Sequence, residues 1–195
     1  MNLSQHDLDW GASMGLHFSS EIRHHKITKE WQFRGKEKEL SDLLLKQSRS
    51  SFFFNGAAKG NPGLAGAGGI IKNKEGITVA NFAWGLEQSS SLQAEALALL
   101  QGLKQAKAMD LSEVSIIGDS QAIIKVLVED SSLVDISLAR IISRIRILMK
   151  SFWTTSLLYV LRENNKDFDI EANRAVPLSA GYLLADEIES WDSIP

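Results

Sequence analysis

The sequence predicts an α/β fold, in which a mixed five-stranded sheet carries helices on both faces. Three apolar segments follow one another between residues 52 and 85 with only short turns between them, which is typical of an antiparallel meander. After them, strand-like and helical segments alternate to about residue 176, which indicates parallel neighbours in the same sheet. A chain of 195 residues with 44% hydrophobic content can bury one such core.

The first fifty residues are expected to form an irregular extension with one amphipathic helix at about 36–47. Residues 1–34 show neither a helical nor a strand period clearly. In the helix, Leu40, Leu43 and Leu44 fall at i, i+3 and i+4, with Lys and Glu on the opposite side. Such a helix either docks on the edge of the domain, which is the commoner case, or binds a protein partner.

The meander begins at Phe52 to Phe54, an apolar run typical of a buried strand. A loop at 58–64 with two glycines and a proline follows, and two further strands are expected at 65–72 and 77–85. The turn between these two strands, 73–76, ends in a glycine that can adopt a positive φ.

Helices and strands alternate after the meander. Ser89, Ser90 and Ser91 offer an N-cap to a helix that runs to about Ala108. The remaining elements are expected as a strand at 114–117, helices at 120–128 and 137–149, a strand at 154–161 and a helix at about 166–176. These elements place one domain at residues 51–181, between the extension 1–50 and an acidic tail 182–195.

The charge balance gives little general support for nucleic-acid binding. The chain has 21 basic and 24 acidic residues, and four of the acids lie in the tail 182–195, which has no Lys or Arg. The rest of the chain is therefore nearly neutral, whereas nucleic-acid-binding proteins usually present a basic face. Any such binding must depend on local patches.

The absence of cysteine excludes disulfides, thiolate catalysis and zinc-finger sites. Asp7 and Asp9 stand where a signal peptide would need a basic start and an apolar run. No stretch approaches the roughly 20 apolar residues of a membrane helix. We therefore expect a soluble intracellular protein, cytoplasmic or nuclear, with no membrane partner.

Three acidic residues are candidates for a site, and two of them occupy places where an acid is unusual. Glu95 interrupts a nearly apolar helix face, Asp119 ends the apolar run 114–117, and Asp169 lies near the start of the last helix. A buried acid without partners is costly, and the carboxyl end of a buried strand is where open α/β sheets place their sites. Taken singly, each acid has an ordinary explanation as a solvated Glu, a helix cap or a first-turn acid.

Taken together, four segments resemble the catalytic core of the ribonuclease H superfamily, especially its plant reverse-transcriptase-like branch derived from retroelements. These segments, which all lie within residues 52–181, are FFFNGAAKGNPGLAGAGG, LQAEALALL, IIGDSQAII and RENNKDFDIEAN. The resemblance implies the ribonuclease H-like sheet, with three antiparallel and then parallel strands. It also implies a metal-dependent endonuclease that cleaves the RNA strand of an RNA–DNA hybrid.

The same resemblance assigns the catalytic and metal-binding positions to Asn55, Glu95, Asp119 and Asp169, with Mg²⁺ or Mn²⁺ as the cofactor. The family has an Asp that bridges two metal ions where this chain has Asn55. An amide oxygen is a neutral and weaker ligand for magnesium. A loss of about 3–4 kcal/mol in transition-state stabilisation would lower the rate by roughly 10² to 10³. We therefore expect weak metal binding and weak or absent activity.

A second departure concerns proton transfer. Relatives in this branch commonly carry a His in the last strand where this chain has Tyr159, and no His follows His25. An imidazole proton shuttle is therefore not available within the core.

Some of the residues that the resemblance assigns to contacts with an RNA–DNA hybrid are kept. By resemblance, Asn61 and Gln121 match residues that touch the hybrid in its minor groove, and Ser90 matches a hydroxyl that contacts a phosphate. Lys59 is a candidate phosphate neutraliser. Two functions stay open: a nucleic-acid-binding ribonuclease H-like domain of impaired activity, or a non-catalytic module of retroelement origin that binds nucleic acid or protein.

Overall fold

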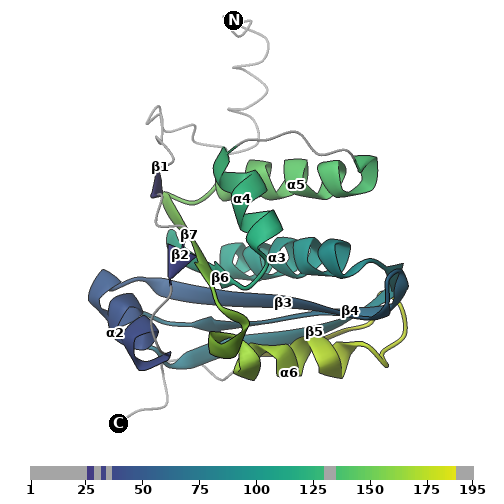
Figure 1. Cartoon of the computed structure of the whole chain (residues 1–195). Helices are drawn as coiled ribbons and strands as arrows, with labels where there is room; N and C mark the ends of the chain where they lie inside the picture. Colours follow the sequence, from purple (N-terminus) through teal and green to yellow (C-terminus); the bar gives the residue numbers. More distant parts are fainter. Residues whose placement is uncertain (1–25, 29–31, 34–36, 130–134, 188–195) are drawn as a thin grey trace, which may run out of the picture.

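One mixed sheet organises the chain in the computed structural model, which describes residues 26–28, 32–33, 37–129 and 135–187 (Figure 1). Within these residues the strand order is β1-β7-β6-β3-β4-β5-β8, and β2 also pairs with β7. The strands are β1 (Lys26–Thr28), β2 (Gln32–Phe33), β3 (Ser50–Gly60), β4 (Gly63–Lys72), β5 (Thr78–Ser89), β6 (Glu113–Gly118), β7 (Thr154–Val160) and β8 (Leu183–Glu187).

The five central strands confirm the predicted fold class. β3, β4 and β5 form an antiparallel meander, and β3, β6 and β7 are parallel neighbours. The pairing of β3 with β6 ends at Phe53 opposite Ile117, whereas β3 continues to Gly60 along β4. The sheet therefore opens between β3 and β6 beside Asn55, at the carboxyl ends of the parallel strands, where α/β sheets place their sites.

Three short strands extend the sheet beyond the prediction. β1 and β2 pair in parallel with β7, within a segment expected to be irregular, and β8 pairs antiparallel with β5 in the expected tail. Strands of two to five residues are too short to show a period in the sequence. The boundaries at residues 50 and 181 stay a prediction, and the sheet crosses both.

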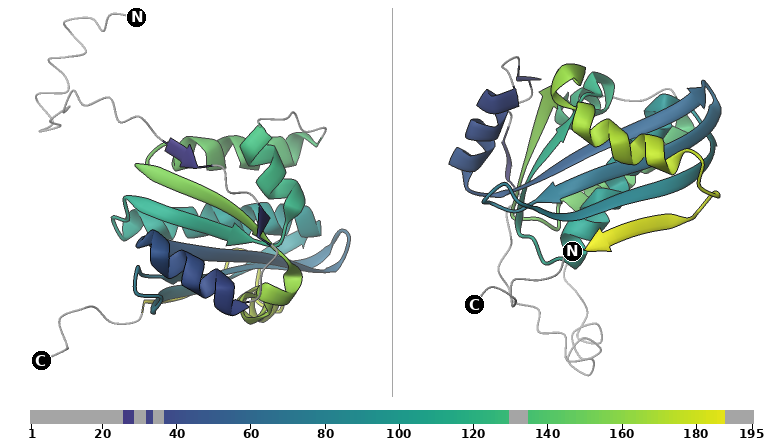
Figure 2. Two further views of the ribbon diagram at one scale, coloured as in Figure 1. Left: turned by 60° about the vertical axis from the view of Figure 1, so that its left-hand side comes forward. Right: turned by 90° about the horizontal axis from the view of Figure 1, so that it is seen from below.

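The helices cover both faces of the sheet (Figures 1 and 2). α3 (Ser91–Ala108), α4 (Gln121–Glu129) and α5 (Ile136–Met149) lie on one side, and α2 (Glu37–Gln47) and α6 (Lys166–Ala175) on the other. Phe52 and Phe54 of β3 share the main core with Leu99 and Leu103 of α3. In the described residues, no helix combines the length and the apolar character that crossing a membrane requires.

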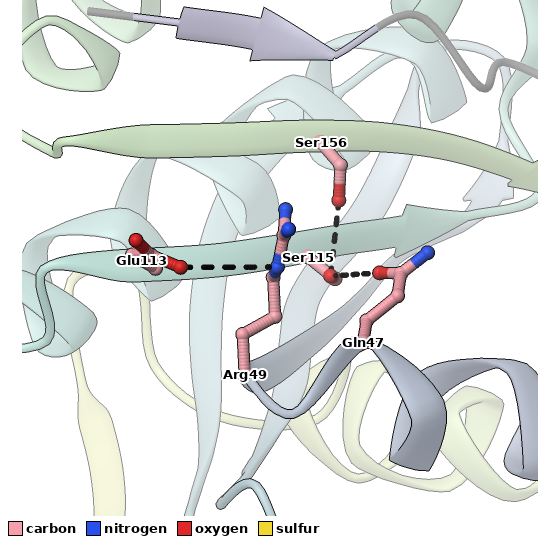
Figure 3. A network of polar contacts seen from close by, with 5 residues as sticks. All are labelled: Gln47, Arg49, Glu113, Ser115 and Ser156. Atoms are coloured by element: carbon pink, nitrogen blue, oxygen red, sulfur yellow. Dashed lines mark hydrogen bonds and ion pairs between the residues drawn. The ribbon is translucent and has the colours of Figure 1, made fainter.

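Helix α2 belongs to the folded unit. Its Leu40 is 3% exposed and packs in a second apolar cluster with residues of β3, β6 and β7, namely Phe53, Ile117, Leu158 and Val160. Figure 3 shows the polar side of the same junction, where Ser115 Oγ donates to Gln47 Oε1 at 2.9 Å and accepts from Ser156 Oγ at 3.0 Å. The predicted helix therefore docks on the sheet through its apolar face.

Candidate active site

The first position of the site lies on β3, just past the end of its pairing with β6. Asn55 is 6% exposed, and its Oδ1 accepts a hydrogen bond of 2.8 Å from the backbone N–H of Gly56. Gly56 lies directly on α3, because a Cβ at this residue would stand 2.2 Å from the nitrogen of Glu95. The missing side chain lets strand and helix backbones touch. Asn55 is therefore adjacent to the start of the helix that carries Glu95.

Glu95 brings a carboxylate from α3. Its Oε2 is buried and has no hydrogen-bond partner among the described residues. Burial raises the pKa of Glu95 well above its usual value, and the negative charges of Asp119 and Asp169 raise this pKa further, whereas Arg162 opposes the rise. The side chain is thus close enough to both acids for mutual repulsion.

Asp119 follows the last residue of β6, beside the opening of the sheet. Its Oδ1 is also buried without a partner in the described part of the chain. Burial raises the pKa of Asp119, and the charge of Asp169 adds to the rise. Tyr159, which stands where the resemblance predicts a His, pairs in register with Gly118, the residue before Asp119. The described residues contain no His, so none of them places an imidazole at this strand end.

Asp169 lies in α6, which follows a single 3₁₀ turn, η1 (Arg162–Asn164). Burial raises the pKa of Asp169, and Arg162 opposes this rise. Nε of Arg162 is 4.0 Å from Asp169 Oδ2. Glu95, Asp119 and Asp169 therefore come from three different elements, and they lie near enough for the charges of the two aspartates to act on Glu95.

Two residues of this site were missed at the sequence level, Arg162 and Asn165. Asn165 is fully buried, and neither polar atom of its side chain has a hydrogen-bond partner in the described part of the chain. Its amide nevertheless lies near enough to Asp119 to oppose the rise in the pKa of that carboxyl. Both residues belong to the segment RENN, which lies between a strand that ends at the site and a helix that begins there.

The donor set fits a hard divalent cation in its chemistry. Three carboxylates repel one another, and two of them have buried oxygens without partners, so positive charge at this point would satisfy both. As they stand, no three His, Asp or Glu side chains of the described residues are grouped as a ready-made metal site. Binding an ion would therefore require the carboxylates to draw closer together.

The four residues assigned to nucleic-acid contacts lie in two places. Lys59 and Asn61 are exposed at the turn between β3 and β4, and the pairing of Gly63 with Ser89 brings this turn beside Ser90. Ser90 caps α3, because its Oγ accepts from the backbone N–H of Gln93.

The fourth of these residues, Gln121, is the exposed first residue of α4, two positions after Asp119. The polar residues therefore flank the carboxylates at the start of α3 and at the start of α4.

A cavity of about 100 Å³ lies elsewhere, between α2 and the adjoining parts of β3 and β4. Leu44, Phe53 and Lys72 line it, and Asn164 of η1 contributes to its wall. It contains none of the acids, so the site described above is a separate feature at the open end of the sheet.

Comparison with known proteins gives a consistent result. Residues 53–175 match a family model described as reverse transcriptase-like. A protein of Arabidopsis thaliana that carries the name of ribonuclease H is 30% identical over 144 residues, which is 72% of this chain and 22% of that protein. Ribonuclease HI of Halobacterium salinarum is 32% identical over 124 residues, 64% of this chain and 62% of the relative. The chain thus spans less than two thirds of either relative.

Solved structures agree with this comparison. RNase H1 from Halobacterium salinarum has a TM-score of 0.63 at 32% identity, covering 65% of this chain and 96% of its own. An RNase H domain from Mycobacterium tuberculosis has a TM-score of 0.63 at 22% identity, covering 66% of this chain and 98% of its own. LC11-RNase H1, in a complex with an RNA/DNA hybrid, has a TM-score of 0.61 at 22% identity, covering 66% and 96%. The M. tuberculosis domain and LC11-RNase H1, at 22% identity, show that the fold is alike.

Proposed function

Because the chain belongs to the reverse transcriptase-like family of ribonuclease H domains, we propose that it binds RNA–DNA hybrids and descends from enzymes that hydrolyse their RNA strand. The observation that carries the proposal is the meeting of Glu95, Asp119 and Asp169 from three elements beside the opening of the sheet. The match to a reverse transcriptase-like family model supports retroelement descent, and the similarity to an Arabidopsis protein supports a plant lineage.

Each residue has a distinct role in this proposal. Glu95, Asp119 and Asp169 would hold Mg²⁺ or Mn²⁺, with Asn55 as the fourth and altered ligand. Two such ions, when bound, would supply an activated water and neutralise charge on the attacking and leaving oxygens. Burial raises the pKa of all three carboxyls, and repulsion by neighbouring acids raises the pKa of Glu95 and Asp119 further, which supports this assignment.

Asn55 is the reason we propose low activity. Its amide has no charge to offset a cation, and its one liganding oxygen accepts the hydrogen bond of Gly56 N–H. A carboxylate at this place would keep a second oxygen for a metal ion. Tyr159 adds to the impairment, because a phenol cannot take over the proton shuttle that an imidazole provides.

Recognition of the hybrid would fall to Lys59, Asn61, Ser90 and Gln121. Hybrid duplexes are recognised by shape and by phosphate and 2′-hydroxyl contacts, for which small polar groups and a lysine are suited. The position of these residues on both sides of the carboxylates supports a duplex that lies across the site.

A second candidate function is a non-catalytic binding module. Asn55 and Tyr159 favour it, because both replace groups that the chemistry would use. The partner would be nucleic acid or a protein, and α2 would be a candidate surface for the latter, since Leu45 is 45% exposed on it.

The decisive experiment follows a labelled RNA–DNA hybrid with Mg²⁺ or Mn²⁺ for wild type, Asp119→Asn and Asp110→Asn. Asp110 is an exposed acid after the far end of α3 and serves as the matched control. We expect wild type and both variants to bind the hybrid, and a slow cleavage that Asp119→Asn alone abolishes. Binding without any cleavage would favour the non-catalytic module. The absence of both binding and cleavage would overturn the proposal.

A further inference from the structure

Arg162 is a cation fixed at the mouth of the acidic site. The turn η1 that carries it is closed by two backbone hydrogen bonds, from Asn164 N to Leu161 O at 2.8 Å and from Asn165 N to Arg162 O at 3.0 Å. These bonds hold Arg162 just past the carboxyl end of β7, next to the end of β6 that leads to Asp119. Its Nε lies 4.0 Å from Asp169 Oδ2.

The charge of Arg162 acts on the whole cluster. It opposes the rise in the pKa of Glu95, of Asp119 and of Asp169, so all three carboxylates experience it. The side chain is 82% exposed, so the guanidinium can turn away from Asp169 without any change in the fold. A guanidinium stays charged at every physiological pH and binds carboxylate or phosphate equally well.

We propose that Arg162 is an internal counter-cation of this site, which competes with a divalent metal ion for the three carboxylates and turns to a backbone phosphate when a duplex binds. The inference depends on the proposed function, from which it takes the metal ion and the duplex. Its basis is the ion pair with Asp169 at the edge of a cluster in which Glu95 Oε2 and Asp119 Oδ1 are buried without a hydrogen-bond partner among the described residues. Because Asn55 carries no charge, the site holds less negative charge than it would with an Asp there. The guanidinium of Arg162 therefore offsets a larger share of that charge.

The size of the effect follows from the exposure of Arg162. An exposed ion pair is weak, and a cation several ångströms from a metal ion repels it only moderately in water. Removing the charge should therefore tighten metal binding by about threefold to tenfold. Salt should reduce this difference, because the interaction lies at the surface.

The test is a calorimetric titration of Mg²⁺ and Mn²⁺ into the full chain at low ionic strength, with no nucleic acid. Arg162→Gln should bind the ion about threefold to tenfold more tightly than wild type, whereas Arg162→Lys, which keeps the charge, should resemble wild type. Arg174→Gln is the control, because Arg174 pairs with Glu171 and Asp186 instead. Equal affinity of Arg162→Gln and wild type, or no metal binding by any protein, would overturn the proposed competition.

A second measurement addresses the phosphate contact. Binding of a labelled hybrid in EDTA should be about twofold to fivefold weaker for Arg162→Gln than for wild type or Arg174→Gln. Unchanged hybrid binding together with tighter metal binding would contradict the turn to phosphate and leave the competition standing. Failure of every protein to bind the hybrid would contradict the proposed function, while the metal titration would still decide the competition.

Discussion

The backbones of Gly56 and Glu95 touch, so that a Cβ on Gly56 would stand 2.2 Å from the nitrogen of Glu95. This contact joins the strand that carries Asn55 to the helix that carries the first carboxylate. Any side chain at residue 56 would push α3 away from β3 and separate the two ligand positions. The same close approach thus serves both the packing of the core and the geometry of the site.

Gly56→Ala should destabilise the fold, because backbone atoms cannot yield as a flexible side chain can. We expect the free energy of unfolding in urea to fall by about 3 kcal/mol. Gly181→Ala is the control, since Gly181 has a positive φ of 82° but open space around its missing Cβ, and it should cost about 1 kcal/mol from backbone strain alone. Equal costs for the two variants would contradict the contact.

Glu95→Gln should make the protein more stable at high pH. The pKa of Glu95 is raised in the folded state, so its stabilising contribution is present below the unfolded value of about 4.3 and is lost as the pH rises through the folded pKa. A neutral amide avoids this loss. The variant should gain about 1–2 kcal/mol over wild type at pH 8 and little at pH 4, as measured by urea unfolding.

The control for this pH dependence is Glu87→Gln, at an exposed position of β5. This variant should change the free energy of unfolding only slightly, and by the same amount at pH 4 and at pH 8. An advantage of Glu95→Gln that does not grow between pH 4 and pH 8 would show that Glu95 is not strained by burial and by its neighbours.

Gln47→Ala should loosen α2 from the sheet. Ser115 is 1% exposed, and Gln47 Oε1 is the acceptor of its hydroxyl proton, so the variant leaves a buried donor without that partner. The free energy of unfolding should fall by about 1–2 kcal/mol, and amide exchange in α2 should accelerate. Lys46→Ala, an exposed neighbour in the same helix, should have little effect on either measurement. Similar changes in the two variants would contradict the bond's role.

The central sheet could be predicted from the sequence because it depends on strong local signals, and local signals also marked two of the acids. The apolar runs around Phe53 and Ile117 mark buried strands, and Glu95 and Asp119 stand where burial makes an acid conspicuous. Once β3, β6 and α3 are placed, chain geometry brings these residues to one end of the sheet. The family resemblance then added Asn55 and Asp169, which local chemistry alone does not distinguish.

The rest of the site depends on tertiary contacts that leave little trace in a sequence. β1, β2 and β8 are short edge strands stabilised by their neighbours β7 and β5. Arg162 and Asn165 are not acids and carry no local sign of a metal site, so only the position of RENN between two elements could have indicated them. Asn165 is fully buried at the junction of η1 and α6, and no periodicity of the sequence reveals this burial.

We propose that Asn55 is the main limit on catalysis, because the other three carboxylate positions of the site are kept. The most direct measurement compares RNA-strand cleavage of a labelled hybrid by wild type and by Asn55→Asp, with Mg²⁺, with Asn55→Asp/Asp119→Asn as the control. We expect Asn55→Asp to cleave about 10² to 10³ times faster than wild type, and the double variant to be inactive. Cleavage by wild type at the same rate as Asn55→Asp, or no cleavage by either, would contradict the claim.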